Sequence, residues 1–187
     1  MIIADFIKHG FILDFVFQKW YYLVIETRWK RGWNLETKIL FPRWDELPDL
    51  DLYLDQVLLY VNNVCKPAFT ASDKGLTASM INNYVKHAYL DKPLNKKYNR
   101  QQVARLIAIT SLKTVFSIQD IAATLDMLNA QTQSEKLYND FVDYMNGQKL
   151  EVTPIIASAC QTVKLYQQTL AFIQVPKKEE NNDELRA

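Results

Sequence analysis

The fold is decided by residues 76–125, which read LTASMINNYVKHAYLDKPLNKKYNRQQVARLIAITSLKTVFSIQDIAATL. Their first part carries a helix-start signal, in which Thr77 can cap the helix while Leu76 and Ile81 form a hydrophobic staple around it. Apolar residues then recur at helical spacing. We therefore predict a short helix from Thr77 to about His87.

The remainder of this stretch predicts a turn and two further helices. Lys92–Tyr98 contains Pro93 and three lysines, and it predicts a basic turn or a small wing. Asn99 with Gln102 resembles a capping box, and Ser117 with Asp120 starts another helix. A short helix, a basic wing and two more helices is the order expected of a winged helix-turn-helix DNA-binding unit.

The predicted helix 77–87 has an inner and an outer face. Its inner face is expected to hold Ile81, Tyr84 and Val85, with polar groups opposite. Asparagine is a natural bidentate partner for adenine in the major groove, and lysine or arginine beyond the turn can reach phosphates. The candidate DNA contacts are Ser79, Asn82, Asn83 and Lys86 on the helix and Lys96, Lys97 and Arg100 after it. The alternative is that the asparagines are merely solvated.

Charge supports a local and not a global interaction surface. The formal net charge is only +1, so the charge of the whole molecule does not indicate a polyanionic partner. However, seven bases against one acid lie between Lys74 and Arg105, whereas five acids and no base lie between Asp45 and Asp55. The middle of the chain is a basic block.

The composition predicts an all-α protein. Glycine occurs only four times, and apolar residues make up 49% of the chain. Further helices are expected from an Asp49 cap to about Val64, from Ser134 to a stop at Gly147, and after Thr153-Pro154. The last helix is expected to carry an apolar stripe from Ile155 to Ile173. Cys65 and Cys160 are interpreted as buried thiols in a reducing cytoplasm.

We divide the chain into four segments. Residues 1–40 are an aromatic N-terminal extension, 41–130 the DNA-binding helical core, 131–175 a C-terminal helical pair and 176–187 a disordered tail. The first segment holds nine of the 23 aromatic residues, but it contains no apolar stretch long enough to span a membrane. Two interpretations remain: the segment is an amphipathic helix at a membrane surface, or the assigned start of the gene lies too far upstream. In the second reading, translation begins at Leu35.

Residues 76–125 resemble the DNA-binding region of MerR-like regulators, with a short helix, a wing ending in Lys96-Lys97-Tyr98 and two helices. From Phe41 to about Val175, the chain resembles an uncharacterised bacterial family catalogued as domain of unknown function 1836, through Trp44–Asp49, Met80–Tyr84 and Lys97-Tyr98. This second resemblance implies a fold and no activity. MerR-like proteins carry an arginine and paired tyrosines where this chain has Asn82, Asn83 and Tyr84, so their sequence preference does not transfer.

No pattern in the sequence indicates catalysis. His9 and His87 are the only histidines, and neither a glycine-rich phosphate loop nor a metal-ligand spacing is present. We therefore expect a non-enzymatic, cofactor-free cytoplasmic protein that binds double-stranded DNA as a transcriptional regulator and does not bind a membrane. Its last helix is expected either to form a homodimer or to close the core of the monomer. The alternative is a helical adaptor that binds a protein partner.

Overall fold

The computed structural model describes residues 41–66, 75–148 and 151–174 of the 187-residue chain. These residues belong to the second of two compact units, Ile39–Ala187. The predictions for residues 1–40 and for the tail lie outside the described residues. The elements in chain order are η1 (Trp44–Glu46), β1 (Leu52–Tyr53), α2 (Leu54–Cys65), α3 (Ala78–Lys86), β2 (Lys97–Tyr98), α4 (Arg100–Leu112), α5 (Ile118–Asn129), α6 (Ser134–Met145) and α7 (Pro154–Gln174).

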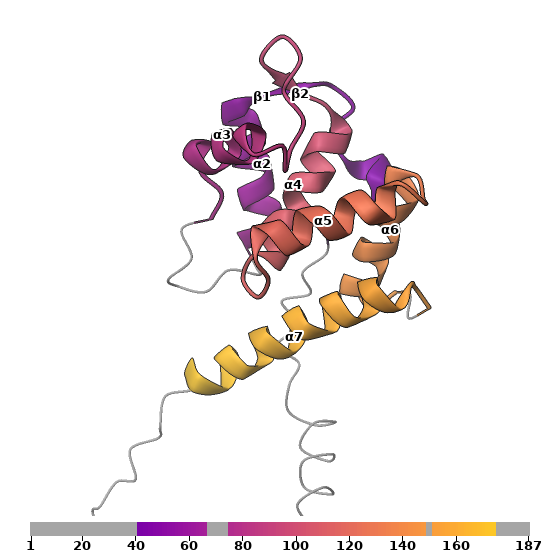
Figure 1. Cartoon of the computed structure of the whole chain (residues 1–187). Helices are drawn as coiled ribbons and strands as arrows, with labels where there is room; N and C mark the ends of the chain where they lie inside the picture. Colours follow the sequence, from indigo (N-terminus) through magenta and orange to yellow (C-terminus); the bar gives the residue numbers. More distant parts are fainter. Residues whose placement is uncertain (1–40, 67–74, 149–150, 175–187) are drawn as a thin grey trace, which may run out of the picture. The chain divides into compact units, whose positions relative to one another are not determined.

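The unit is mostly helical, as predicted, and α4 lies at its centre (Figure 1). Helices α2, α5, α6 and α7 all pack against α4. Nearly all of α4 from Gln102 to Leu112 is buried, and Leu106, Ile107 and Ile109 have no exposed surface. Burial of such side chains is the main favourable term in folding, so α4 organises the core.

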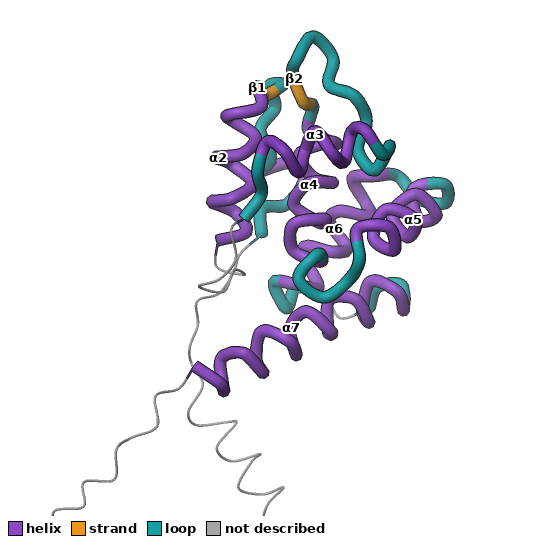
Figure 2. The backbone as a smooth tube through the Cα atoms, turned by 60° about the vertical axis from the view of Figure 1, so that its left-hand side comes forward, coloured by secondary structure: helices purple, strands orange, loops and turns teal. Residues whose placement is uncertain are grey.

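A two-stranded sheet joins the wing to the start of α2 (Figure 2). Strands β1 and β2 are antiparallel, with Tyr53 opposite Lys97. The turn before β2 is closed by a 2.9 Å hydrogen bond from the Lys97 N–H to the Leu94 carbonyl. Asn95 and Lys96 between them both have positive φ, 51° and 64°, which is the pattern of a type I′ turn. The predicted basic turn is thus confirmed.

The predicted starts of three helices are confirmed by their caps. The Thr77 hydroxyl accepts the Met80 N–H at 3.3 Å, and the Ser117 hydroxyl accepts the Asp120 N–H at 3.1 Å. Asn99 and Gln102 exchange two such bonds, at 2.9 and 3.0 Å, and form the expected capping box. These local contacts satisfy N–H groups that the first helical turn leaves without intrahelical partners.

The predicted start of α2 at Asp49 is wrong. The helix begins at Leu54, with extended Tyr53 as its N-cap, and the Gln56 side chain accepts the Tyr53 N–H at 2.9 Å. The physical reason is that Leu52 and Tyr53 form β1 and pair with β2. Asp49 instead forms an ion pair with Arg100.

One detail of the C-terminal helices differs from the prediction. Helix α6 begins at Ser134, as predicted, with Gln133 as its N-cap, and the Ser134 hydroxyl donates to Asn129 at 3.2 Å. On α7, only part of the expected stripe faces inward: Ile156 and Val163 are buried, whereas Ile155 and Ile173 are exposed. The predicted α6 stop is confirmed, because Gly147 has a φ of 73° just after the helix.

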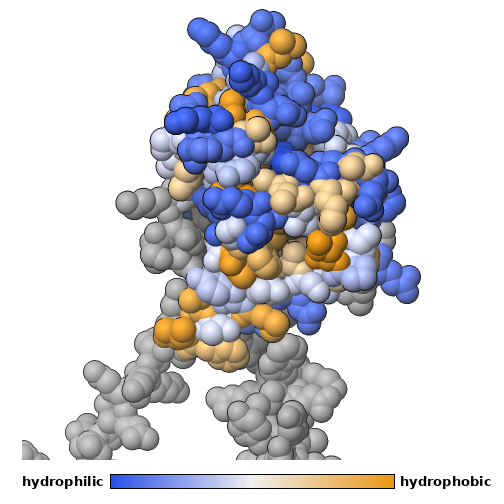
Figure 3. All heavy atoms as spheres, in the orientation of Figure 1, coloured by the Kyte–Doolittle hydropathy of each residue, from blue (hydrophilic) through white to orange (hydrophobic). Residues whose placement is uncertain are grey.

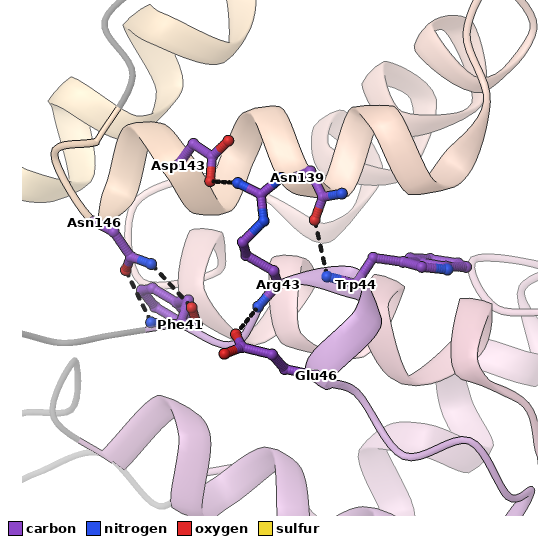
Figure 4. A network of polar contacts seen from close by, with 7 residues as sticks. All are labelled: Phe41, Arg43, Trp44, Glu46, Asn139, Asp143 and Asn146. Carbon is purple, nitrogen blue, oxygen red and sulfur yellow. Dashed lines mark hydrogen bonds and ion pairs between the residues drawn. The ribbon is translucent and has the colours of Figure 1, made fainter.

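The segment before α2 is tied to α6 by polar contacts (Figure 4). The Asn146 side chain accepts from the Phe41 N–H and donates to the Phe41 carbonyl, each at 2.9 Å. Asn139 accepts the Trp44 N–H at 2.8 Å, and Arg43 pairs with Asp143. These contacts hold buried Phe41 against Phe141, with 5.8 Å between ring centroids. Residues 41–46 are therefore part of the folded core.

Replacing Asn146 with alanine is expected to lower the free energy of unfolding by about 1–3 kcal/mol, because it leaves both polar groups of the Phe41 backbone without their partner. Urea denaturation measures the change. Gln148→Ala is the matched control, since this exposed side chain lies two residues away. Equal stabilities of the two variants would contradict the anchoring role of Asn146.

Candidate nucleic-acid interface

Helix α3 is fixed at its N-terminus by side chains from two other elements. Asn62 of α2 accepts the Leu76 N–H at 2.7 Å and donates to the Leu76 carbonyl at 2.9 Å. The Lys113 ammonium donates to the Gly75 carbonyl at 3.1 Å. Together with the Thr77 cap, these bonds set the direction in which the helix leaves the core.

The four candidate residues of α3 share one exposed face. Ile81 and Tyr84 are buried against the core, and burial raises the pKa of the Tyr84 hydroxyl. The opposite face therefore points to solvent. It carries Ser79, Asn82, Asn83 and Lys86, all exposed, at the i, i+3, i+4 and i+7 positions of a single stripe. The predicted division between inner and outer faces is confirmed.

The two wing lysines differ in their surroundings. Lys96 is exposed in the type I′ turn. The Lys97 ammonium lies 5.0 Å from the ring centroid of Tyr53, within the range of a cation–π contact. Lys97 is half-buried as a result, and its charge is held beside β1.

Arg100 is engaged with the segment before β1. Its Nη2 atom lies 2.5 Å from Asp49, and its Nε donates to the Pro48 carbonyl at 3.4 Å. The Asp49 side chain is 92% exposed, so this pair is weak and a phosphate could compete with it. Among the seven candidates, Arg100 is the one that the structure pairs with a carboxylate.

The structure thus places the candidates in two groups, four on α3 and three on the wing and the start of α4. Hydrophilic side chains predominate over the wing and around α3 (Figure 3). His87, which follows α3, is its C-cap, and its ring stacks on Tyr89 with centroids 5.8 Å apart.

Sequence reasoning missed a second feature, a groove of about 390 Å³ between α5 and α7. Its lining comes from helices α4, α5, α6 and α7, from residues 88–91 that follow α3, and from Trp44 and Phe116. Arg105 lies in this groove, where Nε donates to the Tyr89 carbonyl and Nη2 pairs with Asp126, both at 2.7 Å. No local motif marks such a site, because its residues are far apart in the chain.

The described residues offer little for covalent or metal chemistry. Cys65 and Cys160 are free and buried, as predicted, and burial raises the pKa of each thiol to about 12. Neither is therefore a thiolate near neutral pH. Within the described ranges, no group of three or more His, Cys, Asp or Glu residues could hold a metal ion, and no helix has the length and apolarity to cross a membrane.

Comparison with known proteins places the chain in a family. No curated protein and no solved structure matches it. A family model described as domain of unknown function (DUF1836) matches residues 42–141, more than half of the chain. The match spans η1 to most of α6 and includes every residue of the candidate interface. The chain therefore belongs to the DUF1836 family.

Proposed function

We propose that this protein is a sequence-specific, DNA-binding transcriptional regulator of the MerR-like winged helix-turn-helix type. In this proposal, α3 enters the major groove and the wing between α3 and β2 lies against the flanking backbone. The observation that carries it is the stripe of Ser79, Asn82, Asn83 and Lys86, because an exposed polar face on a helix with a buried opposite face suits base recognition.

The order of elements also supports the proposal. Strand β1, helices α2 and α3, strand β2 and helices α4 and α5 follow one another along the chain, and β2 pairs with β1. Pairing of β1 with β2 holds the wing beside the start of α2, so the wing is a defined projection. Its lysines are then available to phosphates on one side of the protein.

The direct test is a salt titration of DNA binding with the wing varied. Lys96→Ala is expected to weaken binding to selected and random duplexes alike, and to reduce the slope of log affinity against log salt by about one. Lys66→Ala is the matched control, because exposed Lys66 lies at the end of α2 away from β1. Absence of affinity of the parent protein for any duplex at low salt would refute the regulator proposal.

A helical adaptor that binds a protein partner is the second candidate. The observation that favours it is the Arg100–Asp49 ion pair, because it partly neutralises one cation of the basic block within the protein itself. An adaptor would bind no duplex at low salt, whereas a regulator would. The titration above therefore separates the two.

We further propose that the regulator is a homodimer that associates through α7. Leu165, Tyr166 and Ile173 are 54%, 40% and 73% exposed and lie on one side of this helix. A stripe of large apolar side chains in water favours burial against a second copy. A dimer would present two α3 helices to two half-sites of a DNA site.

Leu165→Asp with Ile173→Asp is expected to convert the dimer to a folded monomer, because both side chains are exposed and their replacement leaves the core of each copy intact. Light scattering measures the mass in solution. Val163→Asp is the contrasting variant, since Val163 is fully buried and a charge there should unfold the protein. A monomeric parent would contradict the dimer.

A further inference from the structure

The groove between α5 and α7 has the size and lining of a small-molecule site. Its volume of about 390 Å³ lies in the range of pockets that hold drug-sized ligands. Helices α4 and α6 pack against each other and against both walls, and so form its floor. Figure 3 shows hydrophobic side chains in the band between α5 and α7. The apolar lining comes from all four helices and includes Ala108, Leu112, Leu125, Leu137 and Ile156.

The charged side chains of the groove are mostly acidic. In the part of the lining that the structure describes, the acids are Asp91, Asp120 and Asp126, and Arg105 is the one cation. Arg105 is paired with Asp126 at 2.7 Å, so these two charges neutralise each other. Asp120 accepts a hydrogen bond from the Ser117 hydroxyl, and neither it nor Asp91 is within ion-pair distance of a cation in the described residues. Among the described lining residues, two exposed carboxylates, Asp91 and Asp120, therefore have no cation beside them.

Aromatic rings add to the preference for positive charge. Trp44, Tyr89, Phe116 and Phe141 all contribute to the lining. The faces of such rings attract ammonium groups, and the attraction increases when water is excluded. An apolar floor, aromatic rings in the lining and two exposed carboxylates at the rim are complementary to one class of ligand.

We propose that the groove binds a small amphipathic cation, with an apolar body on the floor of α4 and α6 and an amine or quaternary ammonium group at the groove's rim, to which the exposed carboxylates Asp91 and Asp120 belong. This binding activity goes beyond DNA recognition and does not depend on it. An anionic ligand of the same shape would meet the two carboxylates and be repelled.

The position of the groove gives the ligand a route to α3. Residues Ala88–Asp91 both follow α3 and line the groove. The Tyr89 carbonyl accepts from Arg105 Nε at 2.7 Å, so this segment is tied directly to a groove side chain. The Tyr89 and Leu90 N–H groups donate to the Tyr84 carbonyl of α3 at 2.8 and 3.2 Å, so this lining segment is also bonded to the C-terminal end of α3.

The test uses two probes with the same alkyl chain and opposite charges, decyltrimethylammonium and decanesulfonate, each below its critical micelle concentration. Isothermal titration calorimetry with the full-length protein is expected to show at least about tenfold tighter binding of the cation. Absence of cation binding, or equal or tighter binding of the sulfonate, would overturn the proposal. DNA is not needed, so its failure is distinct from failure of the regulator proposal.

Two sets of variants locate the binding. Asp91→Asn with Asp120→Asn is expected to weaken cation binding about tenfold, and Asp51→Asn, an exposed acid that does not line the groove, should leave it unchanged. Ser158→Trp should fill the groove from the exposed wall of α7 and abolish binding. Unchanged affinity in the Ser158→Trp variant or in the double aspartate variant would place the probe elsewhere and refute the proposal.

Discussion

Replacing Ile81 with alanine is expected to lower the free energy of unfolding by about 2–5 kcal/mol, because it removes a fully buried side chain and leaves a cavity beneath α3. Ile81 lies in the same core as Tyr84 and Leu76, which also belong to the segment that positions α3. Its loss therefore weakens the attachment of the proposed recognition helix. Urea denaturation measures the change, with the curves of both proteins fitted to one common m-value.

The matched control for this variant is Asn82→Ala, one residue further along the same helix. Asn82 is exposed, so its truncation should change stability by less than about 0.5 kcal/mol. The pair separates packing from helix propensity, because both variants place alanine in α3. A loss below about 1 kcal/mol for Ile81→Ala would mean that α3 is not packed on the core as described.

Local signals explain why much of the fold could be predicted from the sequence. The caps at Thr77, Asn99 and Ser117 each depend on hydrogen bonds to a residue three positions away. The buried face of α3, with Ile81 and Tyr84, follows from helical spacing of apolar residues, which is also a local property. Each of these predictions is confirmed.

The predictions that failed depended on partners far away in the chain. Asp49 resembles a helix cap by local criteria, but β1 forms next to it because Tyr53 pairs with Lys97. Likewise, nothing near Phe41 indicates that Asn146, 105 residues further on, bonds to its backbone. Local chemistry does not specify such pairings, since tertiary structure decides them.

In the candidate interface, too, local features could be predicted from the sequence, and contacts between distant residues could not. Helical periodicity was sufficient to place Asn82, Asn83 and Lys86 on the outer face of α3. The engagement of Arg100 with Asp49 was not predictable, because it joins residues 51 positions apart. The α5–α7 groove was missed for the same reason, since its lining converges only in the folded chain.

Replacing Asn82 or Asn83 with alanine is expected to weaken binding to the preferred DNA site by about 1–3 kcal/mol, with little effect on random duplexes. The physical reason is that a base contact is lost at one sequence only, whereas phosphate contacts remain at every sequence. Both asparagines are exposed, so their removal should leave the core intact. Competition binding on a duplex selected from a random library measures the difference.

Asn63→Ala provides the matched control, because Asn63 is an exposed asparagine on α2 and outside the candidate interface. It should leave affinity for both kinds of duplex unchanged. If Asn82→Ala and Asn83→Ala also leave the selected site unaffected while Lys96→Ala weakens all duplexes, α3 does not read bases. The protein would then bind only the phosphate backbone of the DNA, because phosphate contacts carry no sequence information.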